Sequence, residues 1–198
     1  MGMKAAAKVQ FGSDSLAGKK IAVQGVGHVG EYLVSHLAKE GAEIYITDIH
    51  EDTLKNVSSK YGAKVVGLDE IYTVDMDIYA PCALGATVND ETINQLKVDI
   101  IAGAANNQLA NEKVHGQLLL EKGIVYAPDF VVNAGGIINV YAELEGYGKT
   151  EIMRKTENIY NTTLEIINNA NAKGITTHEA AFDVAQTRID NRKKENQK

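Results

Sequence analysis

Cysteine is almost absent from this 198-residue chain, and a long apolar run is missing altogether. The single Cys82 excludes an internal disulfide and fits a reducing compartment, so we expect a cytoplasmic protein. No apolar run approaches the length of a membrane span, and the start Met1-Gly2-Met3-Lys4 lacks the apolar core of a secretory signal. These absences disfavour a secreted or membrane-spanning protein.

Positive charge is also scarce, because the net charge is −6 and Arg192-Lys193-Lys194 is the one basic cluster. We therefore do not expect nucleic acid as a main partner. The five histidines show no metal-ligand spacing, so no metal site is predicted. The apolar fraction of 44% is ordinary for a globular domain of this length.

The most informative stretch is Lys20-Ile21-Ala22-Val23-Gln24-Gly25-Val26-Gly27-His28-Val29-Gly30. An apolar run ends in Gly-x-Gly-x-x-Gly, and an amphipathic stretch follows, which predicts a strand, a tight turn and a helix. Gly25 allows the turn, Gly27 lets a pyrophosphate approach the backbone, and Gly30 lets the helix pack on the strand. The anion is expected on the free N–H groups of the helix N-terminus.

A second apolar run, 43–47, ends in Asp48, about twenty residues after the glycine motif. A carboxylate there can accept the hydroxyls of an adenosine ribose and repels a 2′-phosphate, which predicts NAD rather than NADP. The alternative is a glycine-rich turn and a surface aspartate that bind nothing. The full strand–turn–helix–strand–acid context favours the dinucleotide site.

Strand and helix patterns alternate as far as residue 126, which predicts an α/β fold with a Rossmann-type, doubly wound, mostly parallel sheet. Strands are expected at 20–24, 43–47, 63–66, 77–80, 98–102 and 123–126. Helices are expected at 4–11, 28–40, 51–60, 89–96 and 111–122.

Helices alone are expected from Val131 onward, so we predict one NAD-binding domain over 1–198 with a helical extension at about 150–198. Apolar residues from Ile152 to Ala170 fall at helical spacing in one helix that Gly174 ends. Thr176 and Glu179 form a capping box for a last helix that runs to about Arg192.

That last helix carries an apolar stripe, which favours association or a repositioned helix. We expect either a symmetric homodimer through this helix or a helix folded back over the cleft. The stripe consists of Ala181, Phe182, Val184, Ala185 and Ile189.

In a doubly wound sheet, ligands bind outside the carboxyl ends of the strands. Small and polar segments gather there, and asparagine amides offer a donor and an acceptor that suit a carboxamide. These segments are Gly25–Gly30, Asp48, Ala80–Ala83, Gly103–Asn107 and Pro128–Gly136.

Together these segments resemble the glutamate/leucine/phenylalanine/valine dehydrogenase family over nearly the whole chain. The last two of the matching segments are specific to that family. The matching segments are Gln24-Gly25-Val26-Gly27-His28-Val29, Thr47-Asp48-Ile49, Ala80-Pro81-Cys82-Ala83-Leu84-Gly85, Ala105-Asn106-Asn107-Gln108-Leu109 and Tyr126-Ala127-Pro128-Asp129-Phe130-Val131-Val132-Asn133-Ala134-Gly135-Gly136.

The resemblance implies NAD-dependent oxidative deamination of a branched-chain L-amino acid, and it assigns roles to individual residues. The pyrophosphate would lie on Gly25, Val26, Gly27, His28, Val29 and Gly30; the adenosine ribose on Asp48, beside Ile49; and the cofactor path along Cys82 and Ala83. Asn106 and Asn133 would lie near the nicotinamide, and Ile137 and Val140 in the pocket for a branched side chain. His28 and Gly30 depart from the residues usual in the family, where Asn and often Ala stand.

Family members place a substrate domain, with a Gly-rich segment and its lysines, before the cofactor domain. This sequence has no Gly-Gly-Gly-Lys segment, so no catalytic residue is assigned, and we expect NAD binding with little or no turnover. The alternative is a stand-alone NAD-binding or sensing module, natural or engineered. Judged without the resemblance, Cys82 is a packing residue rather than a nucleophile, and Asn106-Asn107 is compatible with a plain turn. Spacing alone fits Ile137 and Val140 at least as well to ordinary core as to a substrate pocket.

Overall fold

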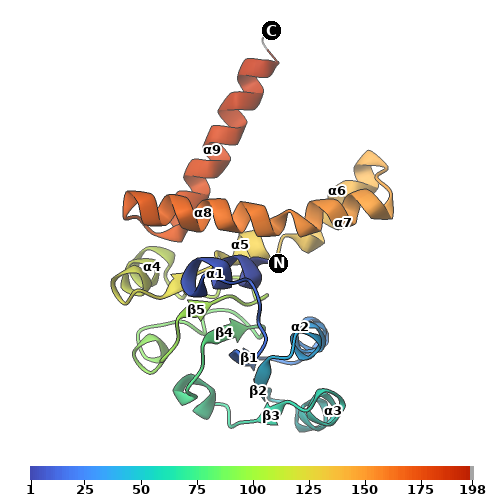
Figure 1. The fold of residues 1–198 in the computed structure, drawn as a ribbon, viewed down its shortest axis with the longest axis vertical. Helices are drawn as coiled ribbons and strands as arrows, with labels where there is room; N and C mark the ends of the chain where they lie inside the picture. Colours follow the sequence, from blue (N-terminus) through green and yellow to red (C-terminus); the bar gives the residue numbers. More distant parts are fainter. Residues whose placement is uncertain (197–198) are drawn as a thin grey trace.

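A six-stranded sheet lies at the centre of the computed structural model, which describes residues 1–196 (Figure 1). All neighbouring strands are parallel, in the order β3-β2-β1-β4-β5-β6. The strands are β1 (Lys20–Gln24), β2 (Glu43–Thr47), β3 (Lys64–Val65), β4 (Ile78–Pro81), β5 (Ile100–Ile101) and β6 (Val125–Tyr126). This order reverses between β1 and β4, as in a doubly wound nucleotide-binding sheet, and confirms the predicted fold class. Residues 197–198 of the predicted domain lie outside the described residues.

Strand register brings the carboxyl ends of the central strands together. Gln24, the last residue of β1, pairs with Thr47 of β2 and with Pro81 of β4. The loops that carry the predicted site residues therefore leave the sheet at one edge. The outer strands β3, β5 and β6 are shorter than predicted and contain two residues each.

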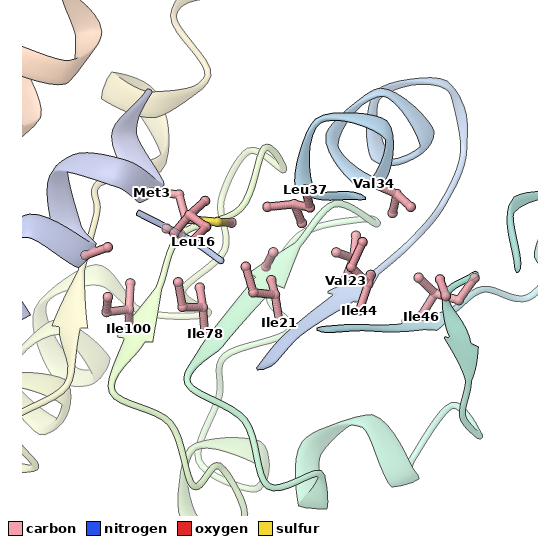
Figure 2. Close-up of a cluster of buried hydrophobic side chains, with 14 of the residues drawn as sticks. Met3, Leu16, Ile21, Val23, Val34, Leu37, Ile44, Ile46, Ile78 and Ile100 are labelled. Atoms are coloured by element: carbon pink, nitrogen blue, oxygen red, sulfur yellow. The ribbon is translucent and has the colours of Figure 1, made fainter. Parts of the chain in front are cut away.

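Side chains of the strands alternate between two buried faces. Ile21, Val23 and Ile78 point toward α1 and α2, where Met3, Leu16, Val34 and Leu37 complete the cluster shown in Figure 2. Ala22, Tyr79 and Ile101 belong to the cluster on the opposite face. Burial on both faces explains why these strands read as continuous apolar runs.

Helices cover the sheet and continue beyond it. α1 lies between the sheet and α8, and α9 projects from the end of α8 away from the sheet (Figure 1). The helices are α1 (Gly2–Phe11), α2 (His28–Lys39), α3 (Glu51–Tyr61), α4 (Glu112–Glu121), α5 (Asp129–Val132), α6 (Gly135–Glu145), α7 (Lys149–Glu157), α8 (Ile159–Lys173) and α9 (Thr177–Glu195), with the short 3₁₀ helices η1 (Glu70–Thr73) and η2 (Thr92–Asn94).

The helix predicted at 89–96 is wrong, because only the single 3₁₀ turn η2 forms there. Asn89 Oδ1 accepts from the backbone N–H groups of Glu91 and Thr92, but the 3₁₀ turn begins only at Thr92. The Thr92 hydroxyl, however, donates to the Thr87 carbonyl at 2.6 Å. Such side-chain bonds to nearby backbone compete with helix propagation.

One helix predicted from Ile152 to Ala170 is two, since α7 and α8 meet at Asn158. The Thr156 hydroxyl donates to the Ile152 carbonyl at 2.8 Å, a contact that bends helices. The capping box of α9 is confirmed: Glu179 N donates to Thr176 Oγ1, and Thr176 N donates to the Glu179 carboxylate.

α9 does not fold over the cleft. Its first turns pack on α8 and α4, and Arg188 pairs with Glu165 of α8 at 2.6 Å. Within residues 1–196, no helix combines the length and apolar character needed to cross a bilayer.

Candidate dinucleotide site

Glycines shape the loop between β1 and α2, and each is required for a different reason. Gly25 has φ +92°, and a Cβ on it would lie 2.6 Å from the Ala83 nitrogen. A Cβ on Gly30 would collide with the Gly25 carbonyl. A Cβ on Gly27 would meet no described atom within 4 Å, so the space beside this residue is open.

The N-terminus of α2 has the properties of a phosphate site. Its first N–H groups have no intrahelical partner, and no side chain of the described residues caps them. Gly27, His28 and Val29 are exposed there, whereas Gly25, Val26 and Gly30 are buried beneath. An anion placed in the open space beside Gly27 would meet backbone donors and the positive end of the helix dipole.

Asp48 follows β2 and is fixed beside the glycine loop. Its Oδ2 accepts from Val26 N at 2.7 Å, and its Oδ1 accepts from His50 N at 2.9 Å. A carboxylate has about four lone-pair sites, so both oxygens can still accept a ribose hydroxyl. Ile49, beside it, is 75% exposed and offers an apolar surface at the same edge.

Cys82 and Ala83 follow β4 and lie against the glycine loop. Cys82 N donates to the Gln24 carbonyl at 2.7 Å, and Ala83 touches Gly25 closely. Burial raises the pKa of the Cys82 thiol to about 11, so the thiol is neutral near pH 7. A neutral thiol is a poor nucleophile, and the packing interpretation of this residue therefore fits the structure.

Two asparagines meet at the carboxyl ends of β5 and β6. Asn133 Nδ2 donates to Asn106 Oδ1, although the residues are far apart in sequence. Both line a cleft of about 780 Å³ together with Val29 of α2 and Ile137 of α6. The cleft thus extends from the N-terminus of α2 to the asparagine pair. Asp48 does not line this cleft.

α6 carries both residues predicted for a branched side chain, but they do not share the cleft. Ile137 lines it and is 71% exposed. Val140 does not line the cleft among the described residues and is 60% exposed, so neither residue is part of the core. They belong to an apolar stripe along α6, made of Ile137, Val140, Tyr141 and Leu144.

The sequence interpretation missed two buried polar residues behind the asparagines, Gln108 and Asp129. Both lie in the segments quoted for the resemblance, in the loops that follow β5 and β6. A buried glutamine and a buried carboxylate in such positions signal hydrogen-bonded loops. Phe130 of α5 was also missed, and it lines the cleft.

Comparison with known proteins agrees with this geometry. Residues 44–196 match the family model described as Glutamate/Leucine/Phenylalanine/Valine dehydrogenase. A leucine dehydrogenase of Bacillus cereus is 53% identical over 188 residues, which cover 95% of this chain and 51% of that protein. A leucine dehydrogenase of Thermoactinomyces intermedius is 53% identical over 96% of this chain and 51% of its own length.

A solved structure supports the same assignment. The crystal structure of L-tryptophan dehydrogenase from Nostoc punctiforme matches with a TM-score of 0.95 and 47% identity, over 98% of this chain and 58% of that one. The chain thus spans about half the length of the curated relatives that it matches. The matched residues, the identities and the shared fold together show that this chain belongs to the Glutamate/Leucine/Phenylalanine/Valine dehydrogenase family.

Proposed function

We propose that this chain is the NAD-binding half of a branched-chain L-amino acid dehydrogenase similar to leucine dehydrogenase. The observation that carries the proposal is the open space beside Gly27 at the uncapped N-terminus of α2, with Asp48 fixed on the same loop. Membership of a dehydrogenase family implies a nicotinamide cofactor. On this proposal the sheet and the helices act as one cofactor-binding unit, with a helical extension from about residue 150.

Asp48 supports NAD over NADP. Its carboxylate is held by two backbone N–H groups, from Val26 and His50, and cannot easily swing away from the loop. A 2′-phosphate on the adenosine ribose would stand beside this negative charge, and the like-charge contact disfavours binding.

The asparagine pair supports the placement of the nicotinamide. Asn106 and Asn133 present amide groups to the cleft, where they can donate to and accept from a carboxamide. Ile137 supplies an apolar wall of the same cleft, and Val140 continues that wall along α6 outside the cleft. When bound, the cofactor would accept hydride from the amino-acid Cα, and water would then convert the imino acid to the 2-oxo acid and ammonia.

The described residues supply no assigned base for this reaction. General acid–base assistance typically contributes about a hundred- to ten-thousand-fold to a rate. We therefore expect the chain alone to bind NAD and to turn over little or no leucine.

Calorimetric titration with NAD and NADP tests the cofactor assignment. We expect the wild type to prefer NAD, and Asp48→Asn to lose much of that preference, since it removes the charge and keeps the size. Asp52→Asn on α3 is the matched control, because Asp52 is an exposed carboxylate a few residues away. Equal affinities of the wild type for the two cofactors would contradict the role of Asp48.

A deamination assay tests the reaction proposed for the dehydrogenase of which this chain would be the NAD-binding half. We expect no leucine-dependent NADH production by the purified chain, and production when a leucine dehydrogenase substrate domain is added. Robust production without that domain would reveal a base in this chain. NAD binding without activity in either case would favour the stand-alone binding module instead.

A further inference from the structure

The loop after β5 is closed around its exposed asparagine by a buried glutamine. Gln108 is 0% exposed, and its Nε2 donates to the carbonyls of Gly103 and Ala105, both at 2.9 Å. These two carbonyls lie before Asn106 in the loop, and Gln108 lies after it. One side chain therefore ties the two ends of the loop together, with Asn106 at the exposed tip.

Backbone bonds from the preceding loop fix the same turn. Ala86 N donates to the Asn107 carbonyl at 2.6 Å, and Val88 N donates to the Gln108 carbonyl at 3.0 Å. Asn107 has φ +51°, a left-handed conformation that asparagine tolerates better than most residues. The turn thus has one shape, and Asn106 emerges from it in one direction.

A buried carboxylate joins this turn to the second asparagine. Asp129 is 9% exposed, and its Oδ2 accepts from Gln108 N at 3.1 Å while its Oδ1 accepts from Phe130 N at 2.7 Å. The Asp129 carbonyl accepts from Asn133 N at 2.9 Å. Asp129 therefore contacts the loop of Asn106 through its side chain and the segment of Asn133 through its backbone.

Neither Gln108 nor Asp129 lines the cleft, but both asparagines that they hold do. We propose that Gln108 and Asp129 are positioning residues that set the Asn106–Asn133 pair for the nicotinamide end of the cofactor. This inference rests on the proposed NAD site. A buried donor or carboxylate is costly unless its hydrogen bonds are made, so the bonds of Gln108 Nε2 and of the Asp129 carboxylate hold the pair in one arrangement.

The two halves of the dinucleotide distinguish positioning from simple stability. ADP-ribose carries the adenosine and pyrophosphate but lacks the nicotinamide, so it would contact the glycine loop and Asp48 and would not depend on the asparagine pair. A residue that acts through Asn106 and Asn133 should change the affinity for NAD and leave the affinity for ADP-ribose unchanged. General damage to the fold should weaken both ligands.

We would titrate NAD and ADP-ribose into the wild type, Gln108→Met and Asp129→Asn by calorimetry. Both substitutions keep the side-chain size and remove the donor amide or the charge. We expect each to weaken NAD by roughly three- to tenfold, the value of one hydrogen bond, with ADP-ribose unaffected. The controls Gln95→Met and Asp52→Asn change exposed residues of the same types and should alter neither affinity.

Equal weakening of both ligands, or no weakening of NAD, would overturn the positioning role. Wild-type affinities that are equal for NAD and ADP-ribose would also overturn the positioning role, but they would remain compatible with the proposed NAD site. A wild type that binds neither ligand would contradict the proposed function itself. If the two variants do not fold, Asn106→Ala is the test. It must lower the affinity for NAD and leave the affinity for ADP-ribose unchanged, because the positioning residues act through that side chain.

Discussion

The carboxyl edge of the sheet and the helices α6–α9 differ in how far their residues are packed and hydrogen-bonded. At the edge, the backbone is packed so closely that a side chain on Gly25 or Gly30 would collide with the neighbouring chain, and Cys82 lies beside Gly30. Both oxygens of the Asp48 carboxylate accept backbone hydrogen bonds. On α6 and α9, large apolar side chains stand in solvent: Leu144 is 81% exposed and Phe182 is 60% exposed.

This difference separates the closely packed edge that carries the proposed cofactor site from the exposed apolar stripes of α6 and α9. Within the glycine loop of this edge, the space beside Gly27 is open, and that is where we propose that the pyrophosphate binds. The helices instead leave whole stripes uncovered, and exposed apolar patches mark surfaces for association. The exposed stripe of α9 is therefore the surface through which we expect association.

The largest effect is expected where the edge is tightest. Gly30→Val places a branched side chain against the Gly25 carbonyl, which is backbone and cannot turn aside. We expect a loss of about 3 kcal/mol or more of the free energy of unfolding, measured by urea denaturation. Gly148→Val is the control, since a Cβ on Gly148 meets no described atom within 4 Å. A Gly30 variant as stable as that control would show that the loop is looser than described.

Gly27→Val tests the open space beside the glycine loop. Gly27 has φ −62°, so a side chain is tolerated by the backbone and finds no neighbour. We expect circular dichroism and unfolding close to wild type, with NAD affinity lower by about a hundredfold, near 2.7 kcal/mol. Retained NAD affinity would mean that the phosphates are held elsewhere.

The buried thiol of Cys82 should make the free energy of unfolding depend on pH. Burial raises its pKa from the ordinary 9.0 to about 11, so the thiol ionises earlier in the unfolded chain than in the folded one. The stabilisation is complete below about pH 9 and is lost as pH rises toward about 11. A shift of this size corresponds to on the order of 2 kcal/mol.

Urea unfolding of wild type and Cys82→Ala at about pH 8 and about pH 10.5 measures this effect. Because the other titrating groups are common to both proteins, the stability difference between them should shrink at the higher pH. A difference that stays constant with pH would show that the thiol is not desolvated.

The smallest effect on folding is expected on α9, where association is tested instead. Phe182 contacts Phe130 and His178 at the start of the helix, whereas Ile189 is 51% exposed farther along. We expect a dimer by light scattering and a monomer for Phe182→Ser/Ile189→Ser. Val114→Ser on α4 is the matched control, with Val114 50% exposed. A wild-type monomer would refute the homodimer.

The sequence predicts the shape of the loop between β1 and α2 because the constraints on that loop are local. Gly25 needs a positive φ, Gly30 needs a missing side chain, and Asp48 needs to follow an apolar run; each requirement selects a residue type that can be read directly. The parallel sheet follows from the alternation of strands and helices, because a helical crossover returns the chain to the same end of the sheet.

Long-range side-chain bonds could not be predicted in the same way. The Thr92 hydroxyl donates to the Thr87 carbonyl beside the short turn η2, and the Gln108–Asp129 contact joins loops that only the folded sheet brings together. The break at Asn158 has no such signal, because the bond from the Thr156 hydroxyl to the Ile152 carbonyl also occurs at Thr163 inside the unbroken helix α8. Spacing places Val140 on the same face of α6 as Ile137, but Val140 lies farther along the helix, outside the cleft lining.

Amide chemical-shift mapping of the whole chain during titration with NAD tests the central claim most directly, because it reports where the cofactor binds. We predict saturable shifts at Gly27, Val29, Asp48, Asn106 and Asn133, along the edge from the glycine loop to the asparagine pair. The exposed stripe of α6 beyond Ile137 and the second half of α9 should not move. Shifts confined to those helices, with none at the glycine loop, would contradict the account.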